Sequence, residues 1–183
     1  MKKIVILTVF VCLTVASVFA QGIRIAHEFQ VYPTGFIPGL RISYDFGGQH
    51  AIHTRLGYNV VRHRDLGVHE NERGGGIGFS LGYDRYFGQD YTGFFVGARM
   101  DLWFNEVDWK DFIDQPTEVN GTTNVTVWQP TIEGGYIFRV INDHFYLAPH
   151  LALGLEVNVV TDGEEVGQGL IGLLGFQFGY RFH

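Results

Sequence analysis

Apolar and polar side chains alternate along most of the chain beyond residue 20. The pattern is clearest at the C-terminus, where large apolar residues occupy every second position. They are Leu174, Phe176, Phe178, Tyr180 and Phe182, and they alternate with Gly175, Gln177, Gly179 and Arg181. A period of two is the repeat of a β-strand with one apolar and one polar face. This alternation predicts a β-protein.

The same alternation recurs in seven further segments, separated by glycine-rich or polar breaks. We predict strands over residues 22–32, 39–46, 50–60, 76–86, 92–104, 125–140, 144–159 and 169–182. The breaks after the second, fourth and sixth strands are short, whereas residues 61–75 and 105–124 form the longest connections. Pro130 and Pro149 interrupt two strands and are expected to mark β-bulges, since proline cannot donate to a ladder.

The composition of the two faces of each predicted strand distinguishes a water-soluble β-sandwich from a membrane β-barrel. The polar face of a strand in a water-soluble β-sandwich usually carries Lys, Glu and Thr, but here it carries Gly, Arg and acids opposite a large aromatic face. In hydrocarbon only helices and closed barrels pair all their backbone groups, and about 9–11 tilted strand residues cross a bilayer. Short turns at one end and long loops at the other are typical of outer-membrane barrels. We therefore predict an all-β protein, an eight-stranded antiparallel up-and-down transmembrane β-barrel, with the sandwich as the alternative.

The lumen of an eight-stranded barrel is narrow, and side chains fill it. The predicted inward face carries five arginines and five acids, namely Arg41, Asp45, Arg55, Asp84, Arg99, Asp101, Glu133, Arg139, Glu156 and Arg181. We expect these charges to pair, because an unpaired buried charge is costly. The pairing predicts a charge network that plugs the lumen, with a narrow channel as the alternative.

Residues 1–20 have the features of a cleaved secretory signal peptide. Lys2 and Lys3 precede a short apolar run, and Val18 and Ala20 stand at the −3 and −1 positions of a cleavage site. The single cysteine, Cys12, lies in this segment. The predicted barrel domain, residues 21–183, therefore has no thiol for a disulfide or a cysteine-based site.

The net charge of the predicted mature domain limits the classes of partner that it can bind. Removing Lys2 and Lys3 changes the formal net charge from −6 to about −8. An acidic domain without a basic stripe argues against nucleic acid as a partner.

These features together resemble the OmpA/OmpX-type family of small outer-membrane β-barrels over nearly all of residues 21–183. The resemblance rests on the signal peptide, the eight alternating strands and the terminal sequence Gly179-Tyr180-Arg181-Phe182. It implies a multi-pass protein of the cell outer membrane, surrounded by outer-membrane lipid and monomeric. It also implies that Tyr180 and Phe182 form the signal read by the barrel-assembly machinery, although His183 follows Phe182 here.

Some small outer-membrane barrels modify lipid A or phospholipid, which makes a serine hydrolase the main rival. Such an enzyme needs a nucleophile, a base and an acid within hydrogen-bond reach. If the second and third strands pair about Gly48, Ser43 lies across from His53 with Asp45 nearby. All three would point inward, where a lipid substrate has poor access, so we expect a polar network rather than a catalytic triad.

The remaining polar clusters favour no cofactor. His63, His69, Glu70 and Glu72 lack a tight metal-ligand spacing, and the acids of residues 108–118 form no EF-hand pattern. We therefore expect no metal and no catalytic residue. The predicted function is non-enzymatic, in envelope integrity or in binding an extracellular ligand through residues 61–75 and 105–124.

Overall fold

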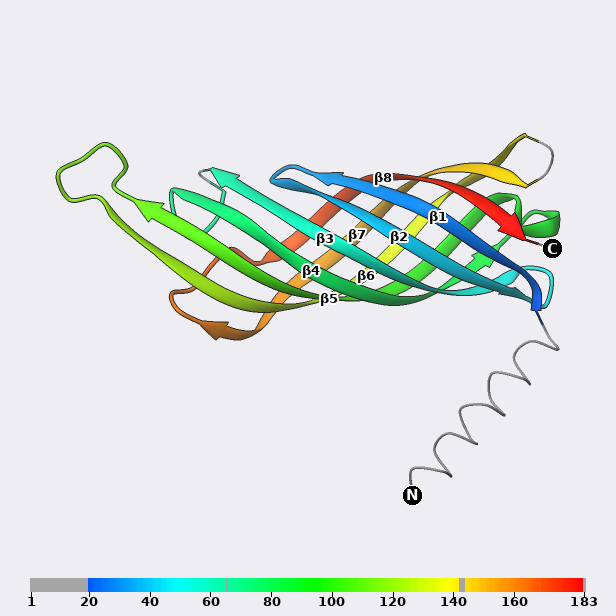
Figure 1. Cartoon of the computed structure of the whole chain (residues 1–183), viewed down its shortest axis with the longest axis horizontal. Coiled ribbons are helices and arrows are strands. Elements are labelled where there is room, and N and C mark those ends of the chain that lie inside the picture. The colour runs from blue at the N-terminus through cyan, green and yellow to red at the C-terminus, as the bar shows by residue number, and fades with distance from the viewer. Residues whose placement is uncertain (1–19, 65, 142–143, 183) are drawn as a thin grey trace, which may run out of the picture.

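The computed structural model describes residues 20–64, 66–141 and 144–182. They form a closed antiparallel barrel of eight strands in which each strand pairs with its neighbours in the chain and β8 pairs with β1 (Figure 1). The strands are β1 (Ala20–Tyr32), β2 (Gly35–Phe46), β3 (His50–Arg64), β4 (Asn71–Tyr86), β5 (Gly93–Asp111), β6 (Val119–Ile141), β7 (Phe145–Asp162) and β8 (Gly169–Phe182). The predicted fold class is thus confirmed as an eight-stranded antiparallel barrel. Within the described ranges, no helix is both long and apolar enough to cross a membrane.

Only Ala20 of the predicted signal peptide is among the described residues, and Cys12 lies outside them. The first described residue, Ala20, begins β1.

Strands β3 to β6 extend further at one end than the alternation predicts. The alternation predicts loops over residues 61–75 and 105–124, but the first connection lies between Arg64 and Asn71 and the second between Asp111 and Val119. The outward positions of these extensions are polar, so the apolar repeat ends while the backbone ladder continues. The extended strands form the left end of the barrel in Figure 1, and the described termini lie at the right end.

The prediction of bulges at the two prolines is wrong. Pro130 pairs in register with Met100, and Pro149 pairs in register with Phe176. Among the described residues of β6 and β7, the register shifts instead between Thr126 and Val127 and again near Arg139. Proline removes one donor but its fixed φ remains compatible with a strand, so the register passes both sites unchanged.

Side chains alternate between the outer wall and the lumen along every strand. The outer wall exposes large apolar side chains such as Leu81, Leu151 and Phe176, whereas the intervening positions are buried. This is the reverse of a water-soluble protein, where large contiguous apolar surfaces are rare.

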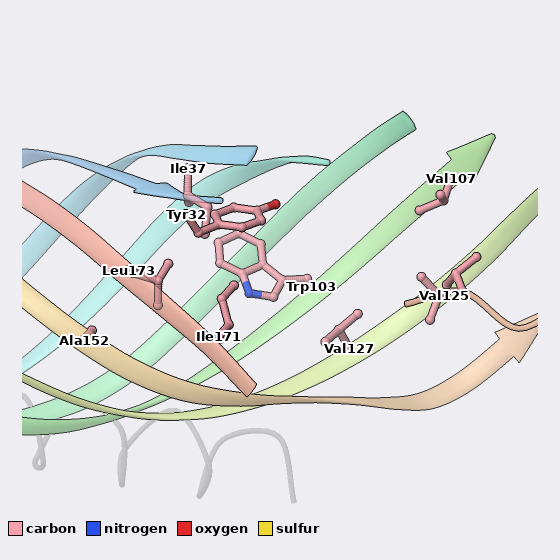
Figure 2. Close-up of a cluster of buried hydrophobic side chains, with 10 residues drawn as sticks. Tyr32, Ile37, Trp103, Val107, Val125, Val127, Ala152, Ile171 and Leu173 are labelled. Carbon is pink, nitrogen blue, oxygen red and sulfur yellow. The ribbon is translucent and has the colours of Figure 1, made fainter. Parts of the chain in front are cut away.

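The lumen is filled in three layers. Along β5, Phe95 belongs to one apolar cluster, Arg99 and Asp101 to a central charged layer, and Trp103 to a second apolar cluster. The first cluster, at the end that holds the termini, consists of Ala26, Ala51, Tyr86, Tyr91, Phe95, Ile137, Tyr146 and Ala148. Figure 2 shows the second cluster, in which Trp103 packs with Tyr32, Ile37 and Ile171. Apolar and aromatic side chains therefore lie on both sides of the charged layer along the barrel axis.

Candidate functional site: the charged layer and the two ends of the lumen

Glu28 on β1 is the centre of the charged layer. Its Oε1 accepts hydrogen bonds from Arg55 Nη1 at 2.6 Å and from Arg99 Nη1 at 3.1 Å, and its Oε2 accepts one from Arg41 Nη1 at 3.0 Å. All four side chains are at most 3% exposed. One carboxylate thus neutralises part of the charge of three guanidinium groups that come from β2, β3 and β5.

Two further acids complete the contacts of Arg41. Its Nη1 donates to Glu133 Oε1 at 2.9 Å, and its Nη2 donates to Asp84 Oδ2 at 2.5 Å. The same Nη2 lies 2.8 Å from His53 Nδ1, which acts as the acceptor because a guanidinium can only donate. Arg41 therefore joins β1, β3, β4 and β6 across the lumen.

Asp101 balances the other two arginines. It accepts from Arg55 Nη2 at 2.8 Å and from Arg99 Nε at 2.9 Å. The hydroxyl of Ser80 also donates to this carboxylate. Charge-assisted bonds of this kind are about twice as strong as neutral ones, and each buried charge here is both paired and hydrogen-bonded.

The network continues toward the end that holds the termini. Arg24 donates to Asp45 from both Nε and Nη2 and to the Tyr86 hydroxyl at 2.9 Å, and that hydroxyl donates to Asp84 Oδ2 at 2.9 Å. Arg181 Nε lies 3.8 Å from Asp45 Oδ2. Hydrogen bonds and ion pairs thus run from the edge of the barrel to its middle.

The structure does not bring all the predicted lumen charges together. Arg41, Asp45, Arg55, Asp84, Arg99, Asp101 and Glu133 lie in the network, and Arg181 lies at its edge. Arg139 is exposed at the barrel end and donates to the backbone carbonyl of Asp90. Glu156 lies in the half of the lumen nearer the extended strand ends, where it lines a small cavity with Tyr32 and Asn59. Both belong to the inward period but lie beyond the layer in which the arginines meet.

The predicted set lacks two charged members of the network, Arg24 and Glu28. Both occupy the polar face of β1, at the same period as Ala26 and Gln30. The signal was therefore present in the alternation. What the sequence could not show is that Glu28 lies at the height where Arg41, Arg55 and Arg99 converge.

Ser43 and His53 face each other across β2 and β3, in the register that a turn about Gly48 predicts. The His53 ring nevertheless binds Arg41 through Nδ1, and Asp45 is held by Arg24. Asp45 therefore does not orient His53, as the acid of a triad would.

His53, Asp84 and Glu133 form the one group among the described residues with the spacing of a metal site, since their donor atoms lie within 4.8 Å of one another. The guanidinium of Arg41 donates to both carboxylates. A metal ion would have to displace this arginine and break its other contacts with Glu28 and His53. The residues present therefore fit an arginine better than a metal.

A short turn covers the end of the lumen that holds the termini. The one-turn helix η1 (Gln89–Tyr91) places the Tyr91 side chain in the barrel, where it is 2% exposed. Its hydroxyl accepts a hydrogen bond from the Gly48 backbone N–H at 3.1 Å, and the guanidinium of Arg181 lies 4.9 Å from its ring. Asp90 and Tyr91 both adopt a left-handed backbone, with φ of 50° and 59°. Such a conformation is costly outside glycine, and here it directs Tyr91 inward.

Glu72 closes the opposite end. This buried carboxylate lies 2.9 Å from His63 Nδ1 and accepts hydrogen bonds from the backbone N–H groups of Val68, His69 and Gly167. The first two groups lie in the β3–β4 connection and Gly167 lies in the β7–β8 connection. One side chain therefore ties two loops over the mouth of the lumen.

The predicted assembly residues lie on the outer wall of β8. Phe182 is 48% exposed, and the ring centroids of Tyr180 and Phe182 lie 4.7 Å apart. Tyr180 also contacts Phe145 on β7. The two side chains thus form part of an aromatic surface beside the β8–β1 closure.

Comparisons with known proteins concern the fold. No protein-family model matches the chain, and no curated protein sequence matches it significantly. The N-terminal β-barrel domain of Pseudomonas aeruginosa OprF covers 90% of the chain and 99% of its own length, at 16% identity and a TM-score of 0.48. Neisserial surface protein A covers 88% of the chain and 95% of its own length, at 14% identity and a TM-score of 0.46. The translocator domain of autotransporter NalP from Neisseria meningitidis covers 89% of the chain and 88% of its own length, at 10% identity and a TM-score of 0.50. At these identities the similarity is one of fold alone.

Proposed function

We propose that the chain is an integral outer-membrane protein whose barrel is closed by its own side chains and whose role is non-enzymatic. The observation that carries the proposal is the distribution of charge and apolar surface. Charged groups are buried in the lumen, while the outer wall exposes side chains such as Leu81 and Leu170, at 66% and 82%. This arrangement is unfavourable in water and favourable in a bilayer, where hydrocarbon surrounds the wall.

The orientation rests on the strand extensions. An even number of strands brings the described ends of β1 and β8 to one end of the barrel, opposite the extended ends of β3 to β6. In outer-membrane barrels the end that projects less from the membrane is the periplasmic side. The extended ends of β3 to β6 then project outward from the cell. Tyr180 and Phe182 would lie at the periplasmic edge, where the barrel-assembly machinery would read them.

The role we propose is envelope integrity or contact with an extracellular ligand. The filled lumen favours neither transport nor a large pore, so activity is left to the outer wall and the outer end. In this scheme residues 61–75 and 105–124 present a binding surface made largely of strand extensions, with short connections at their tips. The protein would act as a monomer without a cofactor.

Membrane fractionation combined with a heat-modifiability gel tests the proposal. We expect the protein in the outer-membrane fraction, with a different mobility in unboiled and boiled samples, because a closed barrel resists unfolding by detergent alone. A soluble periplasmic protein with the same mobility in both samples would contradict the proposal.

The enzymatic alternative rests on the pairing of Ser43 with His53. Lipid A and phospholipid composition can be compared in cells expressing the wild type and Ser43→Ala at equal levels. We expect no difference. A change in acylation that requires Ser43 would support the hydrolase and remove the non-enzymatic role.

A further inference from the structure

Two arginines face each other on the outer wall, just beyond the apolar band. Arg62 on β3 pairs directly with Arg73 on β4, and both side chains are exposed. Like charges in directly opposed positions of an antiparallel pair destabilise a sheet. Arg64 lies on the same face of β3 and is also exposed.

No direct ion pair neutralises these arginines. Asp108 on β5 is the cross-strand partner of Arg73, and its carboxylate accepts a hydrogen bond from the Thr122 hydroxyl at 2.6 Å. Among the described residues no carboxylate lies within ion-pair distance of Arg62 or Arg73. Both exposed guanidinium groups therefore keep N–H donors available for an anionic ligand.

The surface around the pair is hollow. A depression of about 500 Å³ is lined by residues 60–64 of β3 and by Asn71, Arg73 and Gly74 of β4. Gly74 presents no side chain, and the outward positions of this lining are Val60, the three arginines and Asn71. Guanidinium groups present paired N–H donors with the geometry that phosphate oxygens require.

Apolar side chains lie directly below. The guanidinium of Arg62 is 5.7 Å from the ring centroid of Phe36, and Tyr58 and Ile77, on the same face as the arginines, are about half exposed. A ligand that fills this surface needs an anionic group at the height of the arginines and hydrocarbon beneath it. That combination describes a phosphate-bearing lipid better than a free anion.

We infer that Arg62 and Arg73, with Arg64 beside them, form a binding site for the headgroup phosphate of a lipid in the outer leaflet. The acyl chains of this lipid would lie against the wall below Phe36 and Tyr58. The inference rests on the proposed function, because it places this edge of the apolar band at the outer headgroups.

The experiment uses the purified mature barrel in neutral detergent. Binding of diphosphorylated lipid A is compared with binding of diacylglycerol, which lacks phosphate, and with competition by inorganic phosphate. The variant Arg62→Gln/Arg73→Gln is compared with Lys110→Gln, which removes an exposed cation from the outer part of β5. A heat-modifiability gel on each sample tests the barrel separately, so that loss of the fold is distinguished from loss of the site.

We expect the double variant to bind lipid A about tenfold more weakly, since two headgroup cations are lost, while Lys110→Gln binds like the wild type. Wild-type binding should weaken as salt is raised, because the contact is between exposed charges. Equal affinity of the wild type and the double variant would overturn the inference, as would binding that salt does not change. If diacylglycerol bound as tightly as lipid A, the surface would be an apolar groove without a phosphate site. If millimolar inorganic phosphate displaced lipid A completely, the arginines would form a site for free anions. Either result also contradicts the inference.

Discussion

Arg99 Nη1 on β5 lies 3.1 Å from Glu28 Oε1 on β1. These strands are four positions apart in the ring of eight, so the ion pair joins opposite walls of the barrel. A contact between opposite walls leaves no open path along the axis at that height. The closed lumen is therefore a consequence of specific charged side chains rather than of strand number alone.

Glu28→Gln is predicted to destabilise the barrel by about 3–5 kcal/mol, because it leaves three buried guanidinium groups short of one carboxylate. Urea unfolding in detergent micelles measures the change. The matched control is Glu165→Gln in the exposed β7–β8 connection, which should alter stability by no more than about 0.5 kcal/mol. Similar stability of the two variants would show that Glu28 is not the centre of the network.

Gly97→Ala is predicted to destabilise the barrel by about 1–3 kcal/mol through overpacking. A Cβ at this inward position would collide with the carboxylate of Asp84, whereas a Cβ at the outward Gly134 has no neighbour closer than 3.5 Å. Gly134→Ala is therefore the control and should be nearly neutral. Thermal unfolding of both variants measures the difference, and equal melting temperatures would count against the packing described here.

The sequence predicts the strand order, the inward face and most of the charged layer, because all three depend only on a period of two. It does not predict the length of the extended strands, since outside the apolar band polar residues form a ladder as readily as a loop. The sequence also does not predict the height of each inward side chain along the barrel axis. Arg139 and Glu156 have the inward period yet lie beyond the network, while Trp103 continues the period of Arg99 and Asp101 into an apolar layer.

The outer mouth should loosen in acid. Burial alone would raise the pKa of Glu72, but hydrogen bonds from His63 and from the backbone N–H groups of His69, Gly167 and Val68 hold this pKa below its ordinary value of 4.5. A carboxyl whose pKa is lower in the folded than in the unfolded protein stabilises the folded state at every pH above the unfolded pKa. This stabilisation decreases as the pH falls below the unfolded pKa, and it is lost once the pH is below the folded pKa. The two loops should therefore be firmly held at neutral pH and released below about pH 4.5.

Hydrogen exchange at the amides of Val68, His69 and Gly167 measures this release. In the wild type, protection beyond the intrinsic pH dependence of exchange should decrease as the pH is lowered below 4.5. In Glu72→Gln, which cannot ionise, protection should be weaker at neutral pH and should no longer respond to acid. An identical acid response in the two proteins would assign it to other carboxyl groups.

In planar bilayers the wild type is predicted to show little steady conductance, because Tyr91, the charged layer and the Glu72 contacts each obstruct the axis. A stable, large open state under neutral conditions would contradict the closed lumen.

In the proposed membrane barrel the alternation separates a lipid-facing wall from a closed interior, and one native tryptophan reports on each of these two surfaces. Trp128 is 48% exposed on the outer wall and Trp103 is fully buried in the lumen. Tryptophan fluorescence of the barrel reconstituted in lipids with brominated acyl chains tests the separation. The control is Trp109→Phe, which changes a partly buried tryptophan on β5 that packs against the second apolar cluster. We predict strong quenching in the wild type, persistence of that quenching in Trp109→Phe, and its loss in Trp128→Phe. Equal quenching of the wild type and Trp128→Phe, or no quenching in either, would contradict the account.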